Sequence, residues 1–388
     1  MPPVEFTAGN EVRLLHCGAE YFPALIAAID AARREIFLET YIFALDHTGN
    51  EVKDALSRAA ARGVSVSVTT DWLGSGRAAC ALLDDYFRQH RIRYRVFNPW
   101  FTRGVARMHR KVCVVDAQVA FLGGLNINFD YVSDDGFAVP LPAPRWDFAV
   151  MVRGPLVPII HREVEAQWLY QDGLHLRFRF ERFLENQRRR VPPFDEPVLA
   201  AFVYRDNLRN RRTIQRSYLK ALGAARRSAL LANPYFAPNR KLRDGLAAAA
   251  RRGVEVTLLI GVGQFRIQDA VAHSFYPKLL KSGVKVVEYR KTQLHGKVAV
   301  IDDDWATVGS SNWDGLSLFV NHEANVIVRD QAFARDLRRQ IDRAVAEGVV
   351  VRMEDFANIP WYERAWYGMA ALIYKTVLRV ITRGRYTE

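Results

Sequence analysis

The sequence predicts an α/β protein built by tandem duplication, in which two similar lobes each contain a mixed sheet flanked by helices. Three pairs of segments recur in the same order in the two halves of the 388-residue chain. Helix-like and strand-like patterns alternate within each copy, which is typical of layered α/β folds. We therefore expect a pseudo-twofold axis between the lobes, with equivalent sites meeting near it. The recurring pairs are residues 31–44 and 224–237, 55–70 and 245–260, and 108–126 and 294–312.

The elements of each copy follow from local patterns. Apolar residues recur at helical spacing around 20–34 and 213–227, and short apolar strands follow at 35–42 and 228–235. A second, alanine-rich helix then ends at an Arg-Gly pair, where glycine suits the C-terminal stop. A β-branched strand comes directly afterwards, as VSVSVTT in the first copy and VEVTLLI in the second.

The duplication also predicts the domain limits. We expect a first lobe over residues 1–175, a basic linker over 176–204, a second lobe over 205–355 and a basic amphipathic tail over 356–388. The junction is rich in arginine and then interrupted by proline, which favours a linker between the lobes. A basic segment that faces a membrane is the alternative.

Composition limits the class of partner and compartment. Lys and Arg number 55 against 42 Asp and Glu, a net charge of +13. This excess favours a partner with phosphate groups, either nucleic acid or an anionic membrane, although a solvated basic surface would show the same excess. The three cysteines lack metal-ligand or CxxC spacing, which argues against structural zinc and a disulfide framework. We expect neither a secretory signal nor a membrane-spanning helix.

Each half contains the pattern H-x-K-x4-D, at His109–Asp116 and again at His295–Asp302. In a strand, alternate residues share a face, so the His and Lys of each motif point the same way and the Asp points the other way. A Gly-[Gly/Ser]-x-Asn sequence follows each motif, and its small residues allow close approach to an anion. The candidate catalytic residues are His109, Lys111, Asp116, His295, Lys297 and Asp302, and the candidate substrate-binding residues are Asn126 and Asn312.

These residue types suit phosphodiester exchange. One imidazole can attack phosphorus to form a phosphohistidine, and the other, protonated, can give its proton to the leaving alkoxide. The lysines and asparagines would stabilise the extra charge of the transition state, so no metal or other cofactor is expected. Asp116 and Asp302 complete the motifs, but their parity favours a structural role over contact with substrate.

Each histidine also needs a partner that orients its ring. Alignment of the two copies past the motifs matches Asp147 with Glu323, both just before an apolar strand. We expect Asp147 to orient His109 and Glu323 to orient His295, each within its own lobe.

The doubled pattern H-x-K-x4-D-x6-G-[GS]-x-N resembles the phospholipase D superfamily. The segments GNEVRLLHCGAEYFPALIAAID, ARMHRKVCVVDAQVAFLGGLN and SSNWDGLSLFVNHEANV are similar to those of bacterial cardiolipin synthases, above all the B type without N-terminal membrane helices. The resemblance covers roughly residues 9–330. It implies a two-lobed phospholipase D-like fold and a phosphatidyl group that passes through His109 to a second phosphatidylglycerol, with release of glycerol. It also implies a peripheral enzyme on the cytoplasmic face of a bacterial inner membrane, with no nucleic-acid partner.

One departure and several alternatives remain. Relatives often have an Arg-Ser pair after the second Asn and an Asp, whereas Asp314 is followed here by Gly315, which weakens any inference about headgroup recognition. The same motifs also serve a phospholipase D that uses water as acceptor, a metal-independent nuclease or, less well, a lipid-binding protein without activity. The motifs leave open which histidine is the nucleophile.

The C-terminal segment 361–385 has two interpretations. Lys375, Arg379 and Arg383 share one helical stripe, and an apolar set lies on another: Trp366, Met369, Ile373, Val377 and Val380. A basic, aromatic-rich amphipathic helix suits the membrane interface. The alternative is a helix that covers the core of the fold.

Overall fold

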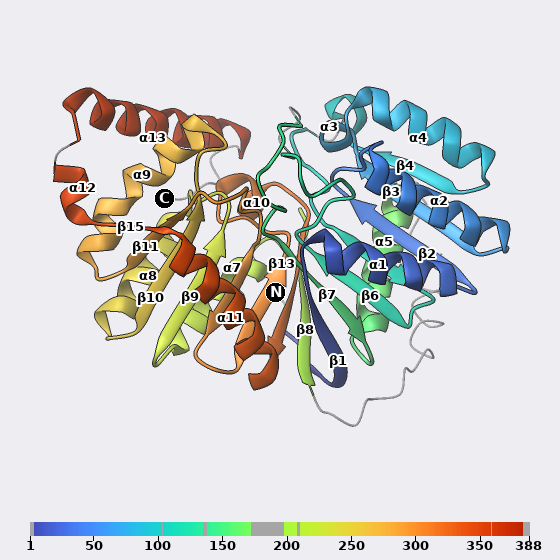
Figure 1. Cartoon of the computed structure of the whole chain (residues 1–388), viewed down its shortest axis with the longest axis horizontal. Coiled ribbons are helices and arrows are strands. Elements are labelled where there is room, and N and C mark those ends of the chain that lie inside the picture. Colours follow the sequence, from blue (N-terminus) through green and yellow to red (C-terminus); the bar gives the residue numbers. More distant parts are fainter. Residues whose placement is uncertain are drawn as a thin grey trace.

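The strands join into one 15-stranded sheet, and its two halves lie side by side (Figure 1). This computed structural model describes residues 4–102, 104–134, 138–171, 198–207, 210–357 and 359–382. The strand order is β15-β11-β10-β9-β12-β13-β14-β8-β1-β7-β6-β5-β2-β3-β4. Apart from β15, the order outward from the β8–β1 junction is the same in both directions, which confirms the α/β duplication.

The first half contains β1 (Thr7–His16), α1 (Cys17–Ala31), β2 (Glu35–Thr40), α2 (His47–Ala61), β3 (Ser65–Asp71), α3 (Trp72–Ser75), α4 (Arg77–Gln89), β4 (Arg93–Phe97), the 3₁₀ turn η1 (Pro99–Phe101), β5 (Val112–Val115), β6 (Val119–Gly123), β7 (Phe148–Arg153) and α5 (Val157–Gln171).

The second half contains β8 (Val198–Arg205), α7 (Thr213–Ala224), β9 (Ser228–Asn233), α8 (Arg240–Arg251), β10 (Glu255–Gly261), α9 (Arg266–Lys281), β11 (Lys285–Tyr289), β12 (Val298–Ile301), β13 (Trp305–Gly309), α10 (Gly315–Phe319), β14 (Glu323–Arg329), α11 (Gln331–Glu347), β15 (Val349–Val351), α12 (Met353–Ala357) and α13 (Trp361–Ile381).

Each half combines parallel and antiparallel pairing. β2, β3 and β4 are parallel, as are β9, β10 and β11, because a helix connects each strand to the next. The hairpins β5–β6 and β12–β13 are antiparallel, and β7 and β14 continue them toward the junction. The strands at the junction, β1 and β8, are antiparallel.

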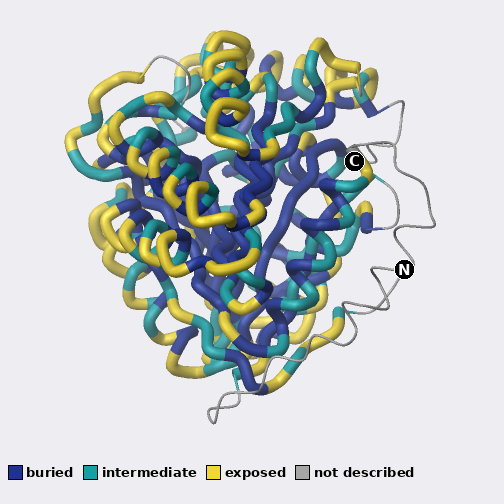
Figure 2. Tube along the Cα trace, turned by 90° about the vertical axis from the view of Figure 1, so that its right-hand side faces the viewer, coloured by how far each residue is buried: buried dark blue, intermediate teal, exposed yellow. Residues whose placement is uncertain are grey.

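The core is shared between the halves. One cluster of buried side chains contains Val150 and Val152 of β7 together with Val308 and Val326 of β13 and β14. Figure 2 shows the buried strands inside and the exposed turns of the helices outside. Because this apolar surface is buried only when both halves are present, the halves hold each other in register.

The sheet also sets the limit between the halves. All but the last residue of β8 (Val198–Arg205) lies within the range expected to be linker, and its residues 199–205 pair with β14. The second half of the sheet therefore begins before residue 205, and that expected boundary was wrong. The arginine-rich part of the expected linker, residues 172–197, lies outside the described residues.

Cys17, Cys80 and Cys113 are buried and free. Over the described ranges, no helix combines the length and the apolar character needed to cross a membrane.

Candidate active site

The two motifs meet at the junction of the halves because each pairs with backbone of the other half. The segment before β5 runs beside the segment before β14, and the N–H of His109 donates to the carbonyl of His322 at 3.0 Å. The segment before β12 runs beside the end of the β6–β7 loop, and the N–H of His295 donates to the carbonyl of Trp146 at 2.9 Å. The motif histidines are therefore held in extended backbone just outside the strands.

Each motif histidine is oriented by a carboxylate from the opposite half. Nδ1 of His109 lies 3.0 Å from a carboxylate oxygen of Glu323, and Nδ1 of His295 lies 2.6 Å from Oδ2 of Asp147. The expected partners were the right two residues, but the assignment within each lobe was wrong. The alignment of the copies shows which residues are equivalent, whereas the crossing of the backbones at the junction decides which ones touch.

Each motif lysine is buried and contacts the backbone of the histidine two residues before it. Nζ of Lys111 donates to the carbonyl of His109 at 2.9 Å, and Lys297 makes the same contact with His295. Burial and the charge of Lys297 lower the pKa of Lys111 to about 7. Burial lowers the pKa of Lys297 to about 8, although Asp147, Asp134 and Glu323 act in the opposite direction.

Burial also lowers the pKa of both histidines. For His109 it falls to about 4, despite the opposing charge of Glu323. His109 is therefore neutral at physiological pH, and with Nδ1–H donated to Glu323 its Nε2 carries the lone pair. Burial alone would raise the pKa of Glu323, but His109 and Lys111 bring it below its ordinary value, so the carboxylate stays ionised.

Small residues let the chain approach these carboxylates. A Cβ on Gly124 would stand 2.1 Å from Oδ1 of Asp147, so only glycine fits there. At the equivalent position, Ser310 donates its hydroxyl to Glu323 at 2.5 Å. The two asparagines are buried: Asn126 accepts the N–H of Ile42, and Oδ1 of Asn312 has no hydrogen-bond partner among the described residues. Such an atom is available to a ligand.

Comparison with known proteins agrees with this geometry. The protein-family model described as "Cardiolipin synthase, PLD-like domain" matches residues 25–135 and 218–345. Cardiolipin synthase B of Escherichia coli (strain K12) is 39% identical over 368 residues, which cover 93% of this chain and 86% of the relative. The chain belongs to the phospholipase D-like cardiolipin synthase family. A cardiolipin synthase of Clostridium perfringens (strain SM101) is 26% identical over 358 residues, 90% of this chain and 74% of that one.

A solved structure shares the fold. Phosphatidylserine synthase of Haemophilus influenzae Rd KW20 superimposes with a TM-score of 0.70 at 13% identity, covering 98% of this chain and 96% of that chain. At this identity the match shows the two-lobed phospholipase D-like architecture alone.

Within this family motif, the aspartates are distant from the histidines. The carboxylate of Asp116 accepts the N–H groups of Arg33, Arg34 and Glu35 at 2.8–2.9 Å, ahead of β2. Asp302 does the same for residues 226–228, ahead of β9. Both lie at the far end of the motif strand, where they cap a backbone turn. These contacts agree with the orientation expected from their parity, although the partners are backbone amides.

The departure from the family pattern after Asp314 has a structural counterpart. A Cβ on Gly315 would lie 2.2 Å from Cδ1 of Leu378 in α13, and the N–H of Gly315 donates to the hydroxyl of Tyr374 in the same helix. α13 therefore occupies the space next to residue 315 that a larger side chain would need.

One buried residue of the site escaped the sequence analysis. Asp134, on the long β6–β7 segment, places a carboxylate oxygen 3.1 Å from Nε2 of His295. The only signal was its place in an insertion that the second copy lacks.

Over the described part of the chain, no cluster of His, Cys, Asp and Glu is suited to hold a metal ion.

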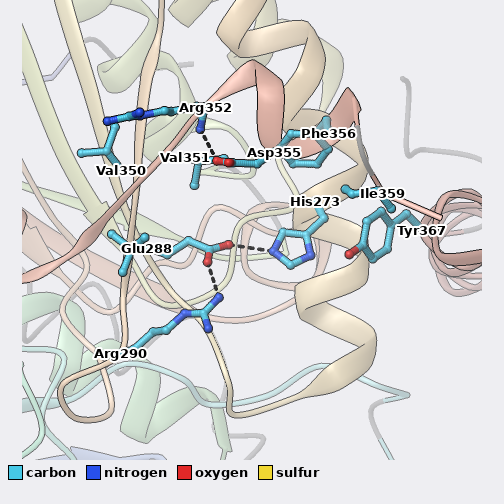
Figure 3. Close-up of a pocket in the computed structure, with 11 residues that line it drawn as sticks. His273, Glu288, Arg290, Val350, Val351, Arg352, Asp355, Phe356, Ile359 and Tyr367 are labelled. Carbon is cyan, nitrogen blue, oxygen red and sulfur yellow. Dashed lines mark hydrogen bonds and ion pairs between the residues drawn. The ribbon is translucent and has the colours of Figure 1, made fainter.

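A separate cavity of about 630 Å³ lies far along the second half, between α9, β11, β15 and the C-terminal helices (Figure 3). His273 donates to Glu288 at 2.7 Å, and Arg290 ion-pairs with the same carboxylate at 2.6 Å. These side chains satisfy one another within one half, and none belongs to the motifs. The cavity is therefore distinct from the candidate active site.

Proposed function

We propose that this chain is a phosphatidyltransferase that joins two phosphatidylglycerol molecules into cardiolipin through a phosphohistidine on His109 and releases glycerol. The observation that carries the proposal is the arrangement of the two imidazoles. Each is buried and held at Nδ1 by a carboxylate of the other half, which leaves Nε2 of His109 for the phosphorus and places Nε2 of His295 beside Asp134. Family membership supports the substrate class.

The reaction proceeds in two displacements. In the first, Nε2 of His109 attacks phosphorus, the P–N bond forms, and the bond from phosphorus to the glycerol oxygen breaks as His295 gives that oxygen its proton. In the second, the hydroxyl of another phosphatidylglycerol returns a proton to His295 and its oxygen attacks phosphorus, which breaks the P–N bond. Lys111, Lys297 and the two asparagines stabilise the added charge in both transition states.

The asymmetry of the two rings supports this assignment of roles. His109 is neutral, and Nε2 is its unprotonated nitrogen. His295 lies between carboxylates on both nitrogens, Asp147 at 2.6 Å and Asp134 at 3.1 Å. Both carboxylates favour the protonated form of His295, although burial has the larger effect and lowers its pKa overall. The acid role of His295 therefore rests on the position of its ring between two carboxylates.

Product analysis tests the reaction. Purified protein is incubated with phosphatidylglycerol vesicles, and the lipids and released alcohol are resolved over time. Cardiolipin and glycerol in equal amounts are expected. Phosphatidic acid and glycerol without cardiolipin would mean that water is the acceptor, and the transfer proposal would fail.

Trapping the intermediate tests the assignment of the nucleophile. The variant His295→Ala keeps the attacking ring, and it should accumulate an acid-labile phosphatidyl adduct on His109 when it is supplied with a donor whose leaving group needs no proton, such as a phosphatidyl nitrophenol. His109→Ala should form no adduct. An adduct mapped to His295 in the wild type would reverse the two roles.

We also propose that the enzyme binds the cytoplasmic face of the bacterial inner membrane as a peripheral protein. α13 supports this, because an apolar stripe at helical spacing points away from the fold, with exposures between 43% and 73%. Its members are Tyr362, Trp366, Met369, Ile373, Val377 and Val380. The opposite side of the helix, with Ala370, Ala371 and Leu378, is the one that packs on the fold.

The first half presents a matching feature. Trp100 and Phe101 in η1 are 63% and 45% exposed, and both contact Trp72 of α3. In Figure 1, α3 and α13 lie along the same edge of the molecule, with the loops of the junction between them. Exposed aromatic residues on both halves of one edge suit an interfacial docking face, and the net charge of +13 suits anionic lipid.

A further inference from the structure

Asp134 is a buried carboxylate that reaches across the junction. It belongs to the segment between β6 and β7 in the first half, yet most of its partners lie in the second. Oδ1 accepts from the side-chain amide of Gln293 at 2.5 Å and from that of Gln264 at 3.4 Å. The backbone N–H of Asp134 donates to Oε1 of Gln293 at 3.3 Å, so two hydrogen bonds join these residues.

The other oxygen faces the reacting atoms. Oδ2 lies 3.1 Å from Nε2 of His295 and accepts from the amide of Asn126 at 3.4 Å. The side chain of Asp134 is only 5% exposed. The charges of His295, Arg145 and Lys297 hold the pKa of Asp134 below its usual range against the effect of burial, so it remains ionised. A negative group thus stands beside the proton that the acid transfers.

The chemistry of this cluster fits a polyol rather than a phosphate. A carboxylate repels a phosphodiester, so it belongs on the side of the leaving alcohol. Three amides and a carboxylate together offer donors and acceptors at short spacing, which is what adjacent hydroxyl groups need. A hydroxyl next to the reacting oxygen can donate to Asp134 while Nε2–H of His295 is directed to the reacting oxygen itself.

We propose that Asp134, with Gln293, Gln264 and Asn126, forms the subsite that recognises the glycerol headgroup beside the acid nitrogen of His295. The subsite serves twice. It holds the glycerol that leaves in the first displacement, and the glycerol of the second phosphatidylglycerol occupies it when His295 takes a proton back, because the second step is the first in reverse. This inference rests on the proposed transferase reaction.

Two donors that differ only in the headgroup test it. Phosphatidylglycerol and phosphatidylethanol with the same acyl chains are presented in the same vesicles, and kcat/KM is measured for release of glycerol and of ethanol. Wild type should prefer the glycerol donor. Asp134→Ala should reduce that preference roughly ten- to hundredfold, the range for a hydrogen bond to a charged group, and Asp134→Asn should fall between the two.

The ratio of the two rates separates recognition from folding. Loss of folded protein lowers both rates equally and leaves the ratio unchanged, so an unchanged ratio in Asp134→Ala overturns the proposal. The matched control is Asp130→Asn, on the same segment, where Asp130 ion-pairs with Arg145 at 3.2 Å and not with His295. Its ratio should stay at the wild-type value, and an equal fall there would assign the effect to the segment and overturn the role of Asp134.

Two further outcomes complete the test. If Asp134→Ala does not fold, Gln264→Leu removes one donor from the same carboxylate at the edge of the cluster, and it should still lower the ratio; an unchanged ratio overturns the proposal. A wild type that releases both alcohols equally well also overturns the subsite while the transferase stands. Release of neither alcohol overturns the transferase itself.

Discussion

In the proposed reaction, Lys111 and Lys297 carry the positive charge that stabilises the phosphoryl transition state, and their burial makes that charge sensitive to pH. Their pKa values of about 7 and about 8 mean that each loses its proton as the pH rises through neutrality. The positive charge is therefore fully present below the lower value and absent well above the higher one. Bound phosphate restores the proton, so the effect belongs to the free enzyme.

We expect kcat/KM to fall as the pH rises through about 7 to 8, while kcat falls at higher pH, because kcat/KM reports the free enzyme. Lys111→Arg should move the alkaline limb of kcat/KM upward, since a guanidinium keeps its charge. Initial rates on phosphatidylglycerol vesicles at constant ionic strength measure both. If the alkaline limb of kcat/KM stays at the same pH in Lys111→Arg, a group other than Lys111 is responsible for it.

Sequence reasoning predicted residues that the structure brings together at the junction, but not all their contacts. The motif and its doubling predicted both histidines, both lysines and the two orienting carboxylates, because the chemistry demands those residue types. The pairing of Asp147 and Glu323 was wrong, since chain connectivity does not reveal which backbone crosses the junction. Asp134 was missed because it belongs to no repeat and no motif.

Asp116 and Asp302 connect neighbouring strands. The carboxylate of Asp116 joins the end of β5 to the start of β2, and that of Asp302 joins the end of β12 to the start of β9. Asp116 receives three backbone N–H groups ahead of β2. Asp116→Ala should therefore lower the free energy of unfolding by about 1.5–3 kcal/mol, the range for hydrogen bonds to a charged group. Activity per folded molecule should remain close to that of wild type.

Denaturant unfolding and active-site titration measure the two effects separately. Asp302→Ala is the matched variant in the other half, with the same kind of backbone partners. A loss of turnover in the folded fraction of either variant would contradict the structural role and return the aspartates to the chemistry.

α13 supplies the second prediction at this scale. Ile373→Ser with Val377→Ser removes apolar area from the outward stripe, where the side chains are 50% and 48% exposed. The pair should weaken binding to anionic vesicles severalfold and leave the unfolding transition nearly unchanged. Leu378→Ser, on the buried side against Gly315, is the control and should do the reverse. Sedimentation with vesicles and thermal unfolding give the two readouts, and unchanged vesicle binding would contradict membrane docking through this face.

The whole molecule is a tandem duplication, which the three repeated segments predicted. Each half supplies the carboxylate that orients the histidine of the other half. The first two helix–strand pairs of each repeat also followed from local patterns. The single continuous sheet could not be predicted from the sequence. The pairing of β1 with β8 that creates it joins residues far apart in the chain and has no local signature. The start of the second half was misplaced for a related reason: β8 follows a charged segment and is recognised as a strand only by its pairing with β14.

Because each histidine is paired with a carboxylate of the opposite half, neither motif has its orienting partner until both halves have been synthesised. The ribosome completes the first half before the second, and that half already contains His109 and Lys111. Glu323, which fixes the tautomer of His109, is translated more than two hundred residues later. We therefore expect a nascent or truncated chain to be inactive, because its His109 lacks the carboxylate that orients it.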